Sequence, residues 1–240
     1  KSKKRLTYKQ AKAILDGKKK SNLKPILEEM VHVAKALQQK RSERGSVQLF
    51  MPELVVKVDK SGKPTGTELV EYDITHQLIE EFMLKANEVV ATHLAKQGKS
   101  VSYRVHEEPS KESLQDFATL VQAFGFSLPQ NPTPFDIQKF FLENEDSPHA
   151  QYLATCYIKS MRLATYSPDN IGHYGLSLEY YCHFTSPIRR YVDTIIHRLL
   201  FSDTIDREEV QQISKFASEQ ERRSAKAEMF VVQLKKLRYL

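Results

Sequence analysis

Two adjacent arginines, Arg189 and Arg190, lie in residues 183–200, which read HFTSPIRRYVDTIIHRLL. A guanidinium group donates two parallel hydrogen bonds to a phosphate or a carboxylate, so the pair suits an anion. Ser186 can cap a helix, and Pro187 fits the first helical position, where its missing N–H costs nothing. The arginines would then lie in the first turn, where free backbone N–H groups also attract anions. The stretch therefore predicts a phosphate site, with salt bridges from the arginines to neighbouring acids as an equal alternative.

The same stretch has the spacing of an amphipathic helix with one buried face. Apolar side chains recur at Ile188, Tyr191, Val192, Ile195, Ile196, Leu199 and Leu200. Arg189, Asp193 and His197 are spaced by four and are expected to share a polar face.

Three histidines, His173, His183 and His197, raise the question of a metal site. No pair of them has the i,i+4 spacing of a helical zinc site, and no acid completes a triad in the sequence. Packing roles are therefore favoured over metal binding for these imidazoles.

The composition is that of a basic protein with one sizeable core. The chain has 240 residues, is 40% hydrophobic and carries a formal net charge of +6, which permits a polyanionic partner. No run of about 18 apolar residues occurs, so no membrane-spanning helix is expected, and no signal peptide opens the sequence. Cys156 and Cys182 show neither a disulfide framework nor zinc spacing, which favours a reducing, cytoplasmic setting.

The first part of the chain is predicted to fold into two helices and a hairpin. Thr7 begins a helix that ends at Gly17, and a second helix spans residues 23–39. Residues 46–72 are predicted to form a β-hairpin, with DKSGKP as its turn.

A long helix is predicted to begin at Asp73 or Thr75 and to end at Gly98. Glu80 and Glu81 interrupt its apolar stripe, and a carboxylate in such a place faces solvent or pairs with a base. The stripe consists of Leu78, Ile79, Phe82, Met83, Ala86, Val89, Val90 and Leu94.

The segment VSYRVHEEPS is predicted to be a strand that leads to a turn at Pro109. Arg104 and His106 would lie on one face of it. Contact with backbone phosphates and a salt bridge to Glu107, Glu108 or the glutamate pair are equally supported.

The remaining elements are mostly helices. They are a helix capped by Ser110, one starting at Thr133, one over residues 149–164, and a long charged helix from about Arg207. Leu176, Leu178 and Tyr180 alternate as in a strand. Residues 111–147 carry no identifiable chemistry.

Several of these segments together resemble one family. HFTSPIRRYVDTIIHR resembles the signature near the end of the RNB catalytic domain of the ribonuclease II and ribonuclease R family. RLTYKQAKAIL, RGSVQLFMPEL, IEEFMLKAN, YRVHEEP and YSPDNIGHYGLSLEYYCHFTS resemble further segments of that domain. The resemblance covers residues 4–240 and is weakest in the middle third.

The resemblance implies an α+β RNB fold, with a mixed sheet flanked by helices around a channel for single-stranded RNA. The implied reaction is processive 3′→5′ hydrolysis of single-stranded RNA to nucleoside 5′-monophosphates. Arg189 would hold the scissile phosphate, Tyr8 would lie near the 3′-terminal nucleotide, and Glu80 would accept from its ribose hydroxyls. Phe50 would stack on a base, although by itself it is an ordinary strand residue. Arg104 and Arg190 are further candidates for RNA contact.

The family's chemistry also requires divalent metal ions, here Mg²⁺, which activate water and neutralise the leaving oxygen. The family holds them with a D-x-x-D-x-D-D cluster that this sequence lacks. We therefore expect residues 1–240 to be part of an RNB catalytic domain, with the metal ligands outside this chain. Alone, the chain is expected to bind RNA weakly as a monomer without hydrolysing it. The alternatives are a non-catalytic RNA-binding module and a structural helical domain without a nucleic-acid partner.

Overall fold

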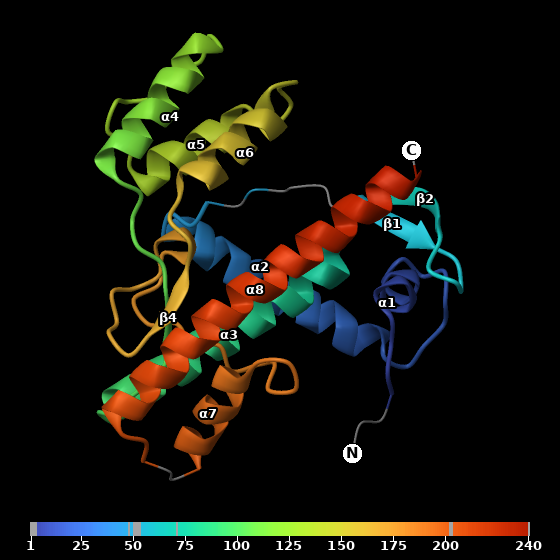
Figure 1. Ribbon diagram of the computed structural model, residues 1–240. Helices are drawn as coiled ribbons and strands as arrows, with labels where there is room; N and C mark the ends of the chain where they lie inside the picture. Colours follow the sequence, from blue (N-terminus) through green and yellow to red (C-terminus); the bar gives the residue numbers. More distant parts are fainter. Residues whose placement is uncertain (1–3, 48, 50–53, 71, 202–203, 240) are drawn as a thin grey trace.

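The computed structural model describes residues 4–47, 49, 54–70, 72–201 and 204–239. Its helices and short strands gather around two separate hydrophobic cores. Helices α4, α5 and α6 form a group at one end of the molecule, and the other elements form the larger body (Figure 1). The expected α+β class is confirmed.

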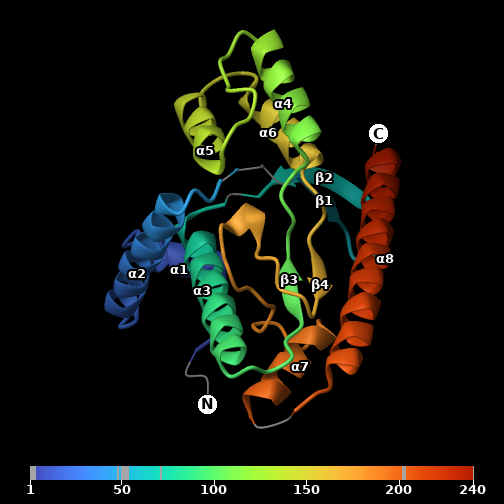
Figure 2. The ribbon, with the colours of Figure 1, turned by 90° about the vertical axis from the view of Figure 1, so that its left-hand side faces the viewer.

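The amino-terminal helices pack against one long helix. α1 (Tyr8–Leu15) begins with a capping box, in which the side chains of Thr7 and Gln10 bond each other's backbone N–H groups. α2 (Lys24–Glu43) follows and lies beside α3 (Ile74–Lys96), which the Asp73 carboxylate caps (Figure 2). The second helix is thus longer than predicted, because the chain leaves it only at Gly45, where φ is +85°.

The larger core lies between α3 and α8. The strand β3 (Tyr103–Val105) pairs antiparallel with β4 (Thr165–Ser167), and α7 (Tyr191–Leu200) packs beside this pair. α8 (Arg207–Tyr239) closes the other side, so that the strands and α7 lie between the two long helices (Figure 2). Buried members include Ala91, Leu94, Val101, Val105, Cys182, Ile195, Ile196, Leu199 and Val210.

The second core belongs to the middle third of the chain. α4 (Lys111–Ala123), α5 (Pro134–Glu143) and α6 (Ala150–Ser160) enclose it. Ser110 caps α4 and Thr133 caps α5, as predicted. Aromatic rings dominate the packing, led by Phe117, Phe140, Phe141 and Tyr157. These helices therefore form a small unit with its own core.

The predicted hairpin is confirmed in its described part. β1 (Leu54–Val58) pairs antiparallel with β2 (Pro64–Leu69), near the carboxyl-terminal end of α8 (Figure 1). The strands of the described residues thus form two separate two-stranded sheets, not the one mixed sheet expected.

Residues 176–180 do not form the predicted strand. A 3₁₀ turn (Tyr174–Leu176) occupies this place, followed by Ser177 in the left-handed region with φ of +50°. Gly175 permits the turn because a Cβ there would lie 3.0 Å from Nδ1 of His106. The helix predicted over 149–164 likewise ends early, at Ser160.

The buried face of α3 differs from the predicted stripe. Ile79, Met83 and Val89 are exposed by 38%, 40% and 51%, whereas polar Glu81 and Asn87 are buried. The face that meets α2 and the 181–184 segment thus carries polar groups, and part of the apolar pattern points outward. Among the described residues, no helix is long and apolar enough to cross a membrane.

Candidate nucleic-acid interface

The two arginines lie just before α7, which begins at Tyr191. Pro187, Ile188 and Arg189 form a turn, in which the N–H groups of Arg189 and Arg190 donate to the carbonyl of Ser186 at 3.3 and 3.1 Å. The prediction that both arginines lie in the first helical turn was therefore wrong. Ile188 is fully exposed and Tyr191 is 59% exposed, so neither belongs to the buried face.

A buried carboxylate explains why the chain turns here. Asp193 is completely buried, and its Oδ1 accepts from the backbone N–H of Ser186 at 2.7 Å. Its two oxygens also accept two bonds from the Arg190 guanidinium, both at 2.8 Å. The carboxylate thus ties the start of the turn to its end, and the expected shared polar face of Arg189, Asp193 and His197 does not exist. His197 also points inward, with Nε2 2.9 Å from the carbonyl of Phe184.

Arg189 differs from its neighbour in being uncommitted. Its side chain is exposed, and no hydrogen bond or ion pair engages it among the residues that the structure describes. Because the turn is held by Asp193, the Arg189 guanidinium is presented from an anchored backbone. This geometry suits the binding of an anion from solution.

Arg104 joins the strands to α8. Its Nη1 donates to Glu221 at 2.6 Å, and its guanidinium carbon lies 4.7 Å from the ring centroid of Tyr166. An acid does bind Arg104, but on α8, and not among the neighbours that the sequence suggested. Glu107 pairs instead with Arg162 at 2.6 Å.

The Tyr166 ring connects Arg104 to the signature segment. The Tyr166 hydroxyl lies 2.8 Å from Nδ1 of His183, the first residue of that segment. Burial raises the pKa of Tyr166 to about 12, so its hydroxyl keeps its proton. Burial, followed by the charges of Arg190, Arg104, His173 and Arg189, lowers the pKa of His183 to about 2. The positive charge of three arginines therefore converges on a neutral imidazole.

His173 is a second neutral imidazole in this region. Burial, His106 and Arg104 lower its pKa to about 3, and its Nδ1 is buried without a hydrogen-bond partner among the described residues. His106 is held by the carbonyl of Arg162 at 2.7 Å and the N–H of Gly175 at 3.1 Å. These contacts are those of packed structural rings.

Acid is expected to destabilise the chain through His183. Its pKa is about 2 when folded and about 6.5 in an unfolded chain. Between these values only the unfolded chain binds the proton, so this stabilisation is full above pH ~6.5 and falls by about 1.4 kcal/mol per pH unit below it. We expect His183→Asn to flatten the pH dependence of urea unfolding by about that slope between pH ~6 and ~4. The matched control is His93→Asn, an exposed ring on α3; equal slopes in wild type and His183→Asn would contradict the prediction.

Asn87 links α3 to the signature segment. Its amide nitrogen donates to the Tyr181 hydroxyl at 3.1 Å, and its oxygen accepts from the Phe184 N–H at 2.9 Å. Asn87 therefore has a specific structural role: it holds the backbone that leads to the arginine turn. Glu80 precedes Asn87 by seven residues, which places it on the same helix face about 10 Å away along the axis.

Glu80 lies beside Arg41, a residue of the last turn of α2. Their charged groups are 3.7 Å apart, and the Glu80 side chain is 40% exposed. Glu81 is buried and accepts from the same arginine at 2.5 Å. The expectation that these glutamates face solvent or pair with a base is thus confirmed in both its forms.

Tyr8 lies at the amino-terminal end of α1, against the first turn of α3. Its ring is 45% exposed and stacks on His76, with ring centroids 4.0 Å apart. It borders an apolar cavity of about 140 Å³ that Ile79 also lines. Phe50 lies outside the residues that the structure describes, so its predicted role stays a prediction.

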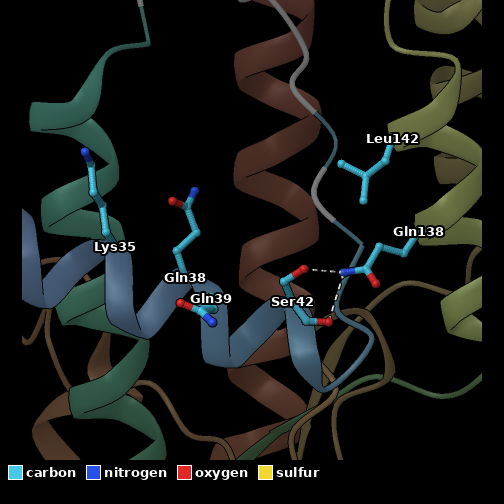
Figure 3. Close-up of a pocket in the computed structure, with 6 residues that line it drawn as sticks. All are labelled: Lys35, Gln38, Gln39, Ser42, Gln138 and Leu142. Atoms are coloured by element: carbon cyan, nitrogen blue, oxygen red, sulfur yellow. Dashed lines mark hydrogen bonds between the residues drawn. The ribbon is translucent and has the colours of Figure 1, made fainter.

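A cavity of about 250 Å³ lies between α2 and α5, and most of the residues that line it are polar (Figure 3). Gln138 of α5 reaches across to donate to the carbonyl and the hydroxyl of Ser42 at 3.0 and 2.9 Å, and to the carbonyl of Ser46 at 3.1 Å. One side chain thus ties the α4–α6 group to the end of α2. The complete lining is Lys35, Gln38, Gln39, Ser42, Gln138 and Leu142.

The described residues do not supply a metal centre. They contain no group of three or more histidine, cysteine, aspartate or glutamate side chains arranged to hold an ion. Asp193 is committed to Arg190, and Glu81 to Arg41.

Sequence reasoning missed the residues that organise this interface. Asp193, Arg41, Tyr166 and Glu221 form its ion pairs and hydrogen bonds, yet none was singled out as a site residue. One signal was available, because Asp193 lies three residues before Ile196 and next to Val192, within the buried face. The partners of Arg104 and Arg41 are 117 and 40 residues away, so no local pattern reveals them.

Comparison with known proteins identifies the family. The model of the RNB domain matches residues 1–202. Ribonuclease R of Chlamydia pneumoniae is 41% identical over 242 aligned residues, which cover all of this chain and 36% of that protein. The chain therefore belongs to the RNB-domain family of ribonucleases II and R, and it spans about a third of the length of the curated relatives it matches.

Solved structures agree with this assignment. Mycoplasma genitalium RNase R in complex with ribose methylated single-stranded RNA superimposes with a TM-score of 0.83 and 28% identity, over 89% of this chain and 36% of that one. Yeast Ssd1, described as a pseudonuclease, gives a TM-score of 0.65 at 23% identity, over 88% of this chain and 27% of that one. The latter shows the fold alone. The RNB fold expected from the sequence is thus confirmed.

Proposed function

We propose that residues 1–240 are part of the catalytic domain of a 3′→5′ exoribonuclease that degrades single-stranded RNA processively to nucleoside 5′-monophosphates. The observation that carries this proposal is the exposed, unengaged Arg189 on a turn that a buried carboxylate anchors. Family membership supports ribonuclease chemistry as the reaction class, and the RNA-bound relative supports RNA as the substrate. Because the chain covers 36% of such relatives, the activity is proposed for the longer protein.

Each candidate residue receives a distinct part in this proposal. Arg189 binds the scissile phosphate and stabilises the charge that develops on it. Tyr8 offers its free ring face to the terminal base, and Glu80 accepts from the terminal ribose. Phe50 stacks on another base. Arg104 and Arg190 contribute positive potential to the RNA path while their ion pairs hold them in place.

The metal is proposed to be Mg²⁺, bound by residues other than those described here. When bound, it supplies the activation of water and the neutralisation of the leaving oxygen. The described residues contribute by binding and orienting the RNA.

We also propose a monomer, since both cores are closed within one chain, and a reducing cytoplasm, since Cys156 and Cys182 are both free.

The first test compares the 240-residue chain with the longer protein on 5′-labelled single-stranded RNA with Mg²⁺. We expect the longer protein to shorten the RNA from its 3′ end. The 240-residue chain should bind the RNA weakly and leave it intact, because its described residues hold no metal centre. Mg²⁺-dependent hydrolysis by the isolated chain would contradict the division of the site.

A non-catalytic RNA-binding module is the second candidate, and the described residues, which contain no metal cluster, fit it as well as they fit the first. A longer protein that binds RNA and never shortens it would establish this candidate. The salt dependence of RNA binding distinguishes both candidates from a structural domain. Contacts with phosphates make the logarithm of the binding constant fall linearly with the logarithm of the salt concentration, with a slope of about 0.7 per contact on single strands. Binding that is absent, or insensitive to salt, would indicate the structural domain.

A further inference from the structure

Arg41 lies between the two adjacent glutamates of α3. Its Nη2 donates to Glu81 at 2.5 Å, and its Nη1 lies 3.7 Å from an oxygen of Glu80. Neighbouring residues on a helix point about 100° apart, so these carboxylates diverge from the helix. Helix α2 lies beside α3 (Figure 2). From α2, the planar guanidinium of Arg41 comes within ion-pair distance of both carboxylates.

The two glutamates differ in what they can do. The Glu81 side chain is 4% exposed and is closed off by its partner, whereas the Glu80 side chain is 40% exposed and remains open to a ligand. Arg41 itself is 11% exposed, and its Nε is buried without a hydrogen-bond partner in the described part of the chain. A buried donor left unused is unusual, and here it accompanies a fork directed at both carboxylates.

We infer that Arg41 is a positioning residue that orients the Glu80 carboxylate for the ribose of the terminal nucleotide and thereby sets the discrimination between RNA and DNA. This inference rests on the proposed function. Glu80 accepts from a hydroxyl most strongly when it is ionised and correctly aimed, and the Arg41 cation promotes both. The plainer alternative is that Arg41 only neutralises the buried Glu81.

The charges around Glu80 allow the two roles of Arg41, orienting Glu80 and only neutralising Glu81, to be distinguished. Burial raises the pKa of Glu80, the Arg41 cation opposes that rise, and the Glu81 carboxylate adds to it. Arg41 from α2 and Glu81 from α3 are the charged groups that act on it among the described residues. Removing Glu81 alone therefore favours ionised Glu80, and removing Arg41 disfavours it.

The experiment uses the longer protein and two RNA substrates that differ only in a 2′-OH or 2′-H on the 3′-terminal nucleotide. The readout is the ratio of kcat/KM for the two substrates, and Glu80→Gln defines the ratio without the carboxylate. Glu81→Gln keeps Arg41 beside Glu80 and is the matched control. Arg41→Gln/Glu81→Gln removes the cation without leaving a buried carboxylate alone, and thermal unfolding checks that it folds.

We expect Glu81→Gln to keep the wild-type ratio of kcat/KM values. The double variant should lower this ratio by about tenfold to a hundredfold, as Glu80→Gln does. That range is typical of losing a hydrogen bond to a charged group. The ratio should fall as acid protonates Glu80. The pH at which it falls should be lower in Glu81→Gln than in wild type and higher in the double variant. Arg41→Lys, which keeps the charge but lacks the fork, should fall between wild type and the double variant, and this variant serves if the double one does not fold.

Three outcomes would overturn the inference in different ways. If Glu80→Gln lowers the ratio but the double variant keeps the wild-type ratio, Arg41 is purely structural. Arg41→Lys replaces the double variant in this comparison if the double variant does not fold. A wild-type ratio in Glu80→Gln would remove Glu80 from ribose recognition, and the inference with it. A wild-type protein that never shortens RNA would instead defeat the proposed function on which both depend.

Discussion

Arg189→Ala in the longer protein is expected to lower kcat for RNA shortening by about 10²–10³, the typical cost of losing one preorganised donor to a developing charge. The side chain is exposed and engages none of the described residues, so its removal breaks no contact of the fold. The thermal unfolding temperature should therefore stay unchanged. Single-turnover cleavage of 5′-labelled RNA, with binding measured separately, checks the prediction.

Two further variants sharpen this test. Arg189→Lys keeps the charge and loses the bidentate fork, so it should be intermediate in kcat. Arg223→Ala removes another exposed cation, on α8, and is the matched control. If Arg189→Ala lost no more activity than Arg223→Ala, Arg189 would have no part in the reaction. A loss that appeared only together with unfolding would indicate a structural role.

The signature segment shows where sequence patterns succeed and where they fail. The buried positions Val192, Ile195, Ile196 and Leu199 were predicted correctly, because a helix in contact with a core must present a periodic apolar face. The helix start was predicted four residues too early. Ser186 does begin the turn, but the buried Asp193 accepts from its N–H and from Arg190, and these bonds hold residues 187–189 as a turn ahead of the helix.

The long helix α3 shows a second limit. Its cap at Asp73 and its end near Gly98 were predicted, because caps depend on neighbouring residues alone. Its buried face was predicted from hydrophobicity only in part: Leu78 and Leu94 are buried as expected. Glu81 and Asn87 face inward because Arg41 and the 181–184 backbone satisfy them, whereas Val89 remains outside. Such pairings between distant segments become visible only in three dimensions.

The candidate site shows the same contrast between what local sequence reveals and what contacts between distant segments decide. The resemblance to the family located Arg189, Glu80 and Tyr8, but it could not say which arginines are free to bind a ligand. The structure separates Arg189 from Arg104 and Arg190, whose guanidinium groups are held by Glu221 and Asp193. Ion pairs within and between elements therefore decide which cations remain available for an anionic ligand.

Asp193→Ala is expected to be among the most destabilising single changes in the chain. The carboxylate is completely buried and is held by Arg190 and the Ser186 N–H, and the Arg190 side chain is only 17% exposed. Removing one partner of a buried pair typically costs about 3–5 kcal/mol, because the remaining charge loses its compensation. The turn that carries Arg189 should loosen as well, so RNA shortening should fall even where the protein remains folded.

The control for this prediction is an exposed pair of the same type. Asp169 pairs with Arg207, and both side chains are more than half exposed. Asp169→Ala should therefore cost no more than about 1 kcal/mol in urea unfolding. Arg190→Gln/Asp193→Asn removes both charges and should be less destabilised than Asp193→Ala, since no buried charge is stranded. Equal losses for Asp193→Ala and Asp169→Ala would show that Asp193 does not anchor the turn and that Arg189 is not presented from a fixed backbone.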